Sequence, residues 1–290
     1  MTGTSAPDTG AIPLAYAGIA GAFAEEALVA RFGEPANRVG LDSFDAVFAA
    51  VAGGSARAGV VPIENSLAGS VLENYDLLLE HQLHVVGEVS LPVRHCLLGP
   101  VGATLQHVAQ CRSHPQALAQ CARFLTAHGI EPLAASNTAV AARDVAAGGD
   151  PQQAAVASAR AGRLHGLEVI ASNIQTRDDN TTRFFVIEQE RPGNDHEADK
   201  ASIAFTTRNQ PGALLACLQT IADAGLNLTK LESRPTGAAL WEYTFYADIE
   251  ADGATLLTAG HVTGVLLQLE SRATSVRLLG RYLHANVFLD

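Results

Sequence analysis

From Pro13 onward, short apolar segments alternate with longer segments in which apolar residues recur every three or four positions. Side chains repeat with a period of about 2 along a strand and about 3.6 along a helix, so the two kinds of segment predict strands and helices. Strands are expected at 14–17, 58–63, 85–98 (one long strand or a pair), 107–111, 131–135 and 182–190. Apolar segments at 154–157 and 168–172 complete this series. Helices are expected at 22–31, around 45–48, and at 70–81, 114–128 and 138–147. This alternation indicates an α/β fold with parallel sheets.

The pattern changes after residues 191–200, which are polar, charged and free of large apolar side chains, so we expect a linker there. The segments that follow predict a βαββαβ order, which is the ferredoxin-like plan. They are strand 201–207, helix 211–224, strands 226–233 and 239–248, helix 254–269 and strand 275–282. A chain of 290 residues is long enough for about two domains, in agreement with this division.

Charge and composition narrow the possible functions. The formal net charge of −11 disfavours nucleic acid and anionic membranes as partners, because both need clustered positive charge. Residues 1–12 lack the features of a signal peptide and predict a disordered lead-in, so we expect a cytoplasmic protein. Four scattered cysteines indicate reduced, buried side chains, and no motif predicts a metal or a nucleotide cofactor.

Several corners between strands and helices carry hydrogen-bonding residues. The glycine turn 18–21 offers backbone N–H groups that suit an anion, although most such turns have only a structural role. Residues 62–66 follow a buried strand, at the end where open α/β sheets bind ligands. Residues 113–116 and 136–138 occupy equivalent corners, and each also makes a good helix cap. Together these corners predict a cleft lined by neutral donors.

The segment 178–184 places an arginine beside a threonine at the start of a strand. A guanidinium is a planar set of donors that suits carboxylate recognition, so Arg183 is a candidate for binding an acidic substrate. An ordinary exposed edge strand is the alternative interpretation of this segment.

Six short motifs in order resemble the prephenate dehydratase family over about residues 13–285. They are Gly-x-x-Gly-Ala-Phe at 18–23, Pro-Ile-Glu-Asn-Ser at 62–66, Ser-His-Pro-Gln-Ala-Leu at 113–118, Thr-Arg-Phe at 182–184, Pro-Gly-Ala-Leu at 211–214 and Asn-Leu-Thr-Lys-Leu-Glu-Ser-Arg-Pro at 227–235. The resemblance implies a two-lobed catalytic domain similar to periplasmic binding proteins at 13–190, with lobe 1 at about 13–91 and 177–190 and lobe 2 at about 92–176. It also implies a phenylalanine-binding ACT domain at 201–285.

The resemblance further implies an enzyme that converts prephenate to phenylpyruvate without a cofactor or metal, and Thr182 is the implied proton donor. Glu64 with a raised pKa is the competing donor. Implied catalytic residues are Thr182, Glu64, Asn65 and Ser66; implied substrate contacts are Arg183, Phe184, Gly21, Ser113, Gln116, Asn137 and Thr138; and implied phenylalanine contacts are Asn209, Gly212, Ala213, Leu214, Asn227, Leu228, Glu232 and Ser233. Ala22 and Ala24 stand where the family usually carries hydroxyl residues, so only backbone donation is expected from that turn.

No chorismate mutase segment precedes these motifs, so we expect a monofunctional enzyme, and the ACT domain implies a homodimer or homotetramer. Arogenate dehydratase shares every motif and stays open as an alternative. A non-catalytic amino-acid-binding regulator is a second alternative, which the intact Thr-Arg-Phe and Glu-Asn-Ser motifs disfavour. A transport component would need a signal peptide or lipobox cysteine, and neither is found.

Overall fold

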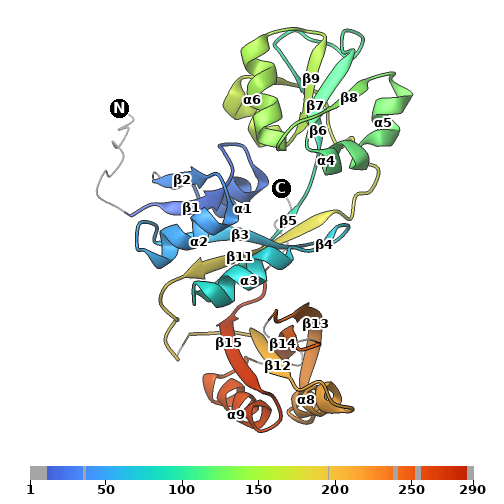
Figure 1. Ribbon diagram of the computed structural model, residues 1–290. Coiled ribbons are helices and arrows are strands. Elements are labelled where there is room, and N and C mark those ends of the chain that lie inside the picture. Colours follow the sequence, from blue (N-terminus) through green and yellow to red (C-terminus); the bar gives the residue numbers. More distant parts are fainter. Residues whose placement is uncertain (1–11, 35–36, 195, 238–240, 252–255, 286–290) are drawn as a thin grey trace.

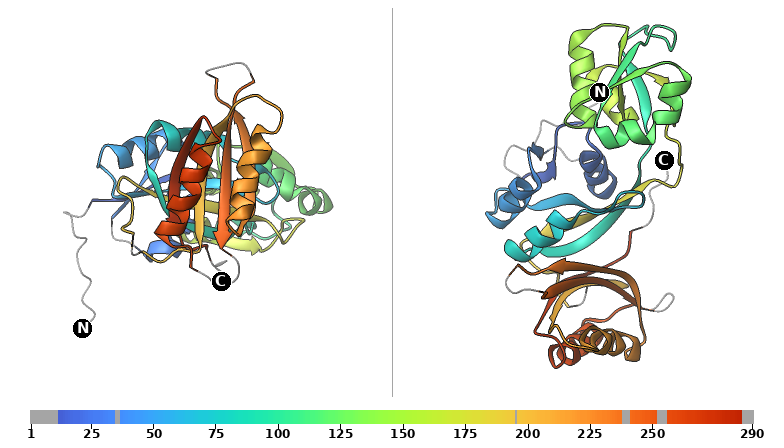
Figure 2. Two further views of the ribbon diagram at one scale, coloured as in Figure 1. Left: turned by 90° about the horizontal axis from the view of Figure 1, so that it is seen from below. Right: turned by 45° about the vertical axis from the view of Figure 1, so that its right-hand side comes forward.

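The computed structural model describes residues 12–34, 37–194, 196–237, 241–251 and 256–285, so nearly all of the expected lead-in lies outside the described residues. Figure 1 shows three tiers: a lobe built from the middle of the chain at the top, a lobe that contains the first strands beneath it, and the C-terminal segment at the bottom. The right-hand view in Figure 2 shows the same three tiers. Within the described residues, no helix is long and apolar enough to cross a membrane.

The first lobe is a mixed sheet whose strand β1 pairs in parallel with β2 and β3, while β11 runs antiparallel to β3 and β5. The parallel pairing expected from the α/β alternation holds for β1, β2 and β3, whereas β11 is antiparallel because it returns from the other lobe in the opposite direction. The short strand β2 was not anticipated from the sequence. The elements are β1 (Leu14–Ala17), α1 (Phe23–Phe32), β2 (Arg38–Leu41), α2 (Phe44–Ala52), β3 (Ala58–Asn65), β4 (Gly69–Ser70), α3 (Leu72–Glu80), β5 (His84–Pro92) and β11 (Thr181–Glu188).

The second lobe has its own sheet, in the order β10-β6-β9-β7-β8. Two chain crossings connect the lobes, one between β5 and β6 and the other between β10 and β11. The helix expected over 114–128 is divided at Cys121, which leaves Gln120 at the end of a short helix. The elements are β6 (Cys96–Gly99), β7 (Gln110–Ser113), α4 (Pro115–Gln120), α5 (Ala122–Ala127), β8 (Glu131–Ala134), α6 (Thr138–Gly148), β9 (Gln153–Ala157), α7 (Ala159–His165) and β10 (Glu168–Ala171).

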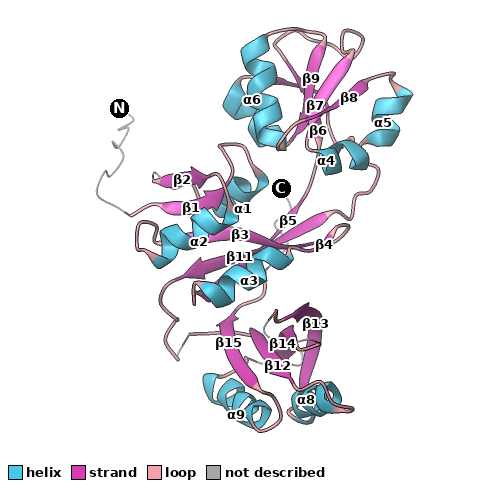
Figure 3. Cartoon of the chain, viewed as in Figure 1, coloured by secondary structure: helices cyan, strands magenta, loops and turns pink. Residues whose placement is uncertain are grey.

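The C-terminal segment has the predicted βαββαβ order, and its antiparallel strands are arranged β13-β14-β12-β15. Helices α8 and α9 cover one face of this sheet, and the other face is turned toward the first lobe (Figure 3). Apolar side chains of the helices and the sheet form a separate core that includes Phe205, Cys217 and Val262. The elements are β12 (Lys200–Thr207), α8 (Ala213–Asp223), β13 (Leu226–Pro235), β14 (Tyr243–Ala251), α9 (Ala259–Glu270) and β15 (Ser275–Tyr282).

The C-terminal sheet is joined to the first lobe by more than the connecting chain. Strand β15 pairs in parallel with β5 at Gly280 and Val85. A Cβ atom at Gly280 would lie 2.0 Å from the Val85 carbonyl oxygen, so this close approach requires glycine. Tyr75 of the first lobe and Tyr246 of the C-terminal segment also share one hydrophobic core. The two parts therefore stabilise each other through buried apolar surface.

Candidate active site in the cleft between the lobes

A cleft of about 350 Å³ opens between the two lobes. Its described lining contains polar and apolar side chains, with no arginine, lysine, aspartate or glutamate. The lining residues are Ala22, Phe23, Pro62, Asn65, Ala68, Gly69, Ser70, Val71, Val93, His95, His114, Gln116, Ala117, Gln120, Asn137, Thr138, Asn180 and Thr182. An anionic ligand would therefore meet hydrogen-bond donors and backbone dipoles here, and no arginine or lysine side chain.

The Thr182 hydroxyl is held by Asn65, the residue opposite it on β3. The Asn65 amide nitrogen donates to Thr182 Oγ1 at 2.9 Å and to Asn180 Oδ1 at 2.7 Å. The Asn65 amide oxygen accepts from the backbone N–H groups of Leu67 at 3.1 Å and Ala68 at 2.9 Å, which fixes the orientation of the amide. Because Thr182 Oγ1 accepts this hydrogen bond, its own hydrogen is left for another acceptor.

The same network crosses to the second lobe. Asn180 Nδ2 donates to Gln120 Oε1 at 3.0 Å, and the same oxygen lies 2.9 Å from His95 Nε2. An amide oxygen only accepts, so His95 carries its hydrogen on Nε2. Burial lowers the pKa of His95, and the side chain is neutral near pH 7. The Phe23 and His95 rings pack nearly perpendicular to each other, with their centroids 5.7 Å apart. This network links Thr182 to both lobes.

The N-termini of α1 and α6 both lie at the cleft. Ala22 precedes α1 without a side-chain cap, so the first N–H groups of that helix are available to a ligand. Asn137 caps α6 by accepting from the Val140 N–H at 2.7 Å, and both Asn137 and Thr138 line the cleft. Helix N-termini favour anions because the backbone dipoles align there.

The expected site residues divide into those that reach the cleft and those that do not. Thr182, Asn65, Gln116, Asn137 and Thr138 all line it. Six others lie outside it: Glu64, Ser66, Arg183, Phe184, Gly21 and Ser113 are absent from the described lining. The structure gives most of these six a partner elsewhere.

Three of the six have local structural contacts. The Ser113 hydroxyl is buried and donates to the Val156 carbonyl at 2.6 Å. Ser66 accepts from the Thr181 N–H at 3.0 Å, which ties the β3–β4 turn to the start of β11. Phe184 is 2% exposed and belongs to the core beneath α1. These contacts give the three residues local structural roles, and their expected contact with a substrate stays a prediction.

The Gly21 N–H is also occupied, since it donates to the buried Glu25 carboxylate at 2.6 Å. The Arg160 guanidinium, from the second lobe, pairs with the same carboxylate at 3.2 Å. A Cβ atom at Gly21 would lie 2.9 Å from Ala161 Cα, and φ is +90°. Glycine is therefore required here by backbone conformation and by the contact between lobes. The expected backbone donation from Gly21 to a ligand stays a prediction, although its N–H already has the Glu25 carboxylate as acceptor.

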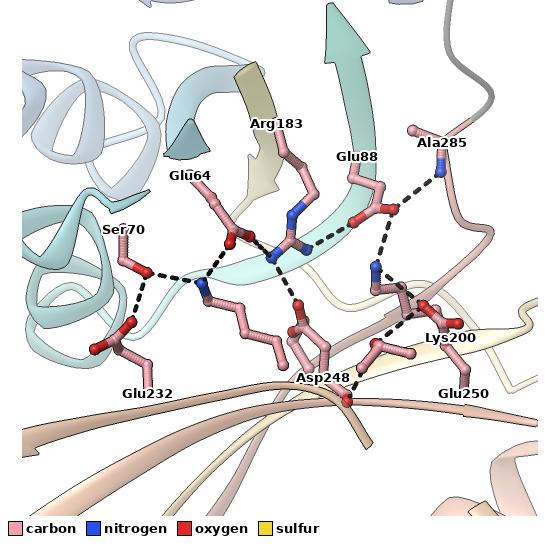
Figure 4. Close-up of polar contacts among 12 residues, drawn as sticks. Glu64, Ser70, Glu88, Arg183, Lys200, Glu232, Asp248, Glu250 and Ala285 are labelled. Carbon is pink, nitrogen blue, oxygen red and sulfur yellow. Dashed lines mark hydrogen bonds and ion pairs between the residues drawn. The ribbon is translucent and has the colours of Figure 1, made fainter. Parts of the chain in front are cut away.

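Arg183 and Glu64 lie on the opposite side of β11 and β3 from Thr182 and Asn65, because successive side chains of a strand point to opposite faces. The Arg183 guanidinium pairs with Glu64 at 3.0 Å, Glu88 at 3.0 Å and Asp248 at 2.7 Å (Figure 4). Asp248 belongs to β14 of the C-terminal segment. The expected role of Arg183 in binding substrate carboxylate is therefore not supported by its position, which is the boundary with the C-terminal sheet.

The expected raised pKa of Glu64 is wrong. Burial by itself raises the pKa of this carboxyl, but the ammonium of Lys230 at 3.1 Å and the guanidinium of Arg183 outweigh that effect. The net result is a lowered pKa. An ionised carboxylate cannot donate a proton, and Glu64 also does not line the cleft. Both observations argue against Glu64 as the competing proton donor.

The residues expected to bind phenylalanine lie in two parts of the C-terminal segment. Gly212 precedes α8 with φ of +80°, a conformation that favours glycine whatever the ligand. Glu232 on β13 accepts from the Ser70 hydroxyl at 2.6 Å and so contacts the first lobe. The residues beside Gly212 are Asn209, Ala213 and Leu214, and the remaining expected contacts on β13 are Asn227, Leu228 and Ser233.

Some prominent site residues were not found from the sequence. No role was assigned to His95, Gln120 or Asn180, and only Asn180 lay in a segment that drew attention. The ionic cluster around Arg183 could have been noticed from the composition. The chain has only two lysines, Lys200 and Lys230, and both lie in that cluster.

The fold and site define an α/β protein with two lobes that enclose an uncharged, donor-rich cleft, joined to a ferredoxin-like C-terminal segment. The model of one family, prephenate dehydratase, matches residues 14–192. The chain belongs to this family, which confirms the resemblance seen in its motifs.

Relatives span almost the whole chain. "Arogenate dehydratase/prephenate dehydratase 2, chloroplastic" of Arabidopsis thaliana is 40% identical over 282 residues, covering 93% of this chain and 72% of the relative. The structure of prephenate dehydratase from Arthrobacter aurescens in complex with L-Phe has a TM-score of 0.82 at 28% identity, over 96% of this chain and 92% of that chain. The structure of GqqA, described as a novel type of quorum quenching acylase, has a TM-score of 0.83 at 33% identity, over 93% and 97% of the two chains.

Proposed function

We propose that this chain is a prephenate dehydratase that forms phenylpyruvate in L-phenylalanine biosynthesis, with arogenate as the alternative substrate. The observation that carries the proposal is the Thr182 hydroxyl, held by the Asn65 amide at 2.9 Å inside the cleft between the lobes. The cleft volume of about 350 Å³ lies in the range of about 300–1,000 Å³ typical of small-molecule sites.

The reaction removes carbon dioxide and the ring hydroxyl of prephenate, and the gain of aromaticity drives it. One proton is consumed, because prephenate plus a proton becomes phenylpyruvate, carbon dioxide and water. The enzyme must donate a hydrogen to the departing hydroxyl and hold the substrate carboxylates in place. A threonine hydroxyl is a weak acid, so its hydrogen moves to the leaving oxygen as the carbon–oxygen bond breaks, and the one proton that the reaction consumes restores the Thr182 hydroxyl from water. Asn65 orients Thr182 for this donation.

Binding of the substrate anion is assigned to neutral donors. The free N–H groups at the start of α1, together with Asn137, Thr138 and Gln116 of the second lobe, surround the cleft. Donors from both lobes meet one ligand only when the lobes are close, so substrate binding favours closure about the two crossings. The crossing residues near 92–96 and 171–181 are the proposed hinges.

The decisive experiment measures phenylpyruvate formed from prephenate and phenylalanine formed from arogenate, side by side with purified protein. Turnover of prephenate with the higher kcat/KM supports the proposal, whereas a preference for arogenate assigns the alternative. No product from either substrate would contradict both.

Amide hydrolysis, the reaction of an acylase, needs a nucleophile activated by a base. The Thr182 hydroxyl contacts Asn65, which is not a base.

We also propose that residues 201–285 form an ACT domain that binds L-phenylalanine, after a catalytic domain at 13–190 and a linker at 191–200. The complex of the Arthrobacter aurescens relative with L-Phe supports this assignment. The proposed effector contacts are the start of α8 at Gly212 and the side chain of Glu232, and a homodimer or homotetramer would form through these domains. Calorimetry with L-phenylalanine tests effector binding. The molar mass measured by light scattering tests the oligomeric state. No heat and no shift in melting temperature would reject effector binding.

A further inference from the structure

A cluster of ion pairs joins the two lobes at α1 and α7, which belong to neither chain crossing. Arg160 on α7 contacts two carboxylates of the first lobe, with Nη2 3.2 Å from Glu25 Oε1 and Nη1 2.7 Å from Glu34 Oε1. Arg38 on β2 contacts the same two carboxylates at 2.7 Å and 2.9 Å. These four residues form the inter-lobe cluster.

The Glu25 carboxylate lies at the buried centre of this cluster. The Glu25 side chain is 1% exposed and that of Arg160 is 11% exposed, so water screens the attraction between them only weakly. Burial by itself raises the pKa of Glu25, but the hydrogen bonds from Arg160 and from the Gly21 N–H outweigh that effect and lower the pKa. The carboxylate is therefore charged at pH 7 and attracts the arginine of the other lobe.

Neutral contacts beside the inter-lobe cluster join the same two parts of the chain. The Ser158 hydroxyl caps α7 and donates to the Gly21 carbonyl oxygen at 3.4 Å. His165 Nε2 lies 3.3 Å from the Ala20 carbonyl oxygen. A Cβ atom at Gly21 would lie 2.9 Å from Ala161 Cα, so α7 packs directly on the turn before α1. The second lobe therefore holds this turn in place.

The turn held by α7 leads into the cleft. Ala22 and Phe23 follow Gly21 and line the cleft, and the first N–H groups of α1 have no side-chain cap. Asn137 and Thr138 of the second lobe line the same cleft. The inter-lobe cluster therefore helps to set the distance between two groups of donors that one ligand would have to meet.

We propose that Arg160 is a positioning residue that holds the lobes together before the substrate binds, so that the donors of both lobes are in place in the free protein. The proposal rests on the closure of the lobes that belongs to the proposed function. Opening the cleft about the two crossings would separate Arg160 from Glu25 and Glu34. The buried Glu25 carboxylate would then lose a charged partner, which is costly, so the open arrangement is disfavoured.

Loss of Arg160 should change KM and leave kcat nearly unchanged. When only a fraction of the free protein is competent to bind, its apparent affinity falls by that fraction. In Arg160→Met, KM for prephenate should rise about tenfold, the scale of one hydrogen bond to a charged group. The substrate-bound protein is closed and keeps Thr182 and Asn65, so kcat should stay within about twofold of the wild-type value.

The experiment compares the wild type and three full-length variants by small-angle X-ray scattering without substrate and by steady-state kinetics with prephenate. Arg160→Met should have the larger radius of gyration at an unchanged molar mass. It should still fold, because Arg38 and the Gly21 N–H continue to bind Glu25. Glu34→Gln removes only the partner that is 61% exposed, and it should raise KM in the same direction by a smaller factor.

Arg163→Met is the matched control, since Arg163 lies on the same helix with an exposed side chain. It should behave as the wild type in scattering and in kinetics. A change of the same size in Arg163→Met would overturn the proposal.

An unchanged KM in Arg160→Met would also overturn the proposal, as would a rise in KM without a larger radius of gyration. A fall in kcat as large as the rise in KM would overturn it too, because that result indicates damage to the donor network around Thr182. Scattering does not depend on turnover. Failure of the proposed enzyme activity would therefore appear as missing product with the difference in radius of gyration intact. Failure of the positioning role would appear as normal turnover without that difference.

Discussion

Strands β3 and β11 separate two very different environments. On one side, Asn65 and Thr182 belong to a neutral network of amides, hydroxyls and a neutral histidine that lines the cleft. On the other side, Glu64 and Arg183 belong to an ionic cluster that includes Asp248 of the C-terminal sheet. Residues that are adjacent in sequence, Glu64 and Asn65 on β3 and Thr182 and Arg183 on β11, therefore lie on opposite sides of the sheet.

The contrast shows how one pair of strands serves two purposes. In the cleft, the charge of a bound anion would be stabilised by helix N-termini and hydrogen-bond donors, which are already oriented before the anion binds. The stability of the ionic cluster requires each buried charge to keep its partner, because a buried charge without a partner lowers the free energy of unfolding. Substitutions on the cleft side should change turnover, and substitutions on the ionic side should change stability and domain docking.

Arg183→Met should have the largest effect, on stability. Removing the guanidinium leaves the carboxylates of Glu64, Glu88 and Asp248 close together with less positive charge, so the free energy of unfolding should fall by about 3–5 kcal/mol. Urea denaturation at pH 7 measures it, and Arg177→Met, at an exposed arginine paired with Asp179, is the control with little expected change. If Arg183 instead binds substrate, KM will rise steeply while stability stays near that of the wild type.

Thr182→Ala should lower kcat by at least about 100-fold, the scale of a lost positioned proton donor. KM should change far less, since the interaction belongs to the transition state. Steady-state kinetics with prephenate measure both constants. Thr182→Ser should keep much of the activity, and Thr181→Ala should have a mild effect. Turnover close to the wild-type value in Thr182→Ala would assign the donor role to another group.

Asn65→Asp should lower kcat by about tenfold, the worth of one hydrogen bond. The aspartate keeps the oxygen that accepts from Leu67 and Ala68 but cannot donate to Thr182. The Thr182 hydrogen would turn toward the carboxylate and away from the substrate. Kinetics and the melting temperature should be measured together, because an unchanged melting temperature attributes the loss to the donor. An unchanged kcat would show that Asn65 does not orient Thr182.

Glu64→Gln should have the smallest effect, seen as altered acid sensitivity. The folded-state pKa of Glu64 is lowered by Lys230 and Arg183, so its contribution to stability is fully present above the unfolded value of about 4.3 and is lost as pH falls through the folded value. Denaturation midpoints at several pH values below about 5 should therefore fall less steeply in Glu64→Gln than in the wild type. Parallel curves would show that Glu64 titrates alike in the folded and unfolded chains.

Periodicity predicted most of the elements, because local patterns of apolar residues reflect burial directly. It predicted the βαββαβ order of the C-terminal segment, which the structure confirms. It did not predict the break at Cys121 or the antiparallel direction of β11. Strand direction depends on where the chain re-enters the sheet, and no local pattern contains that information.

By itself, the sequence determined the family, the order of elements and the motifs that end at the cleft, because these depend on residue types and spacing along the chain. Only the tertiary structure decided which residue of each motif acts where. Asn65 faces Thr182, and Glu64 faces Lys230 and Arg183, although the two are adjacent in one motif. The physical reason is that strand alternation separates neighbours, while packing brings β13 and β14 to the far side of β3 and β11. Each motif therefore predicted where its segment lies in the fold. The contacts of each side chain depend on which side of the sheet it faces.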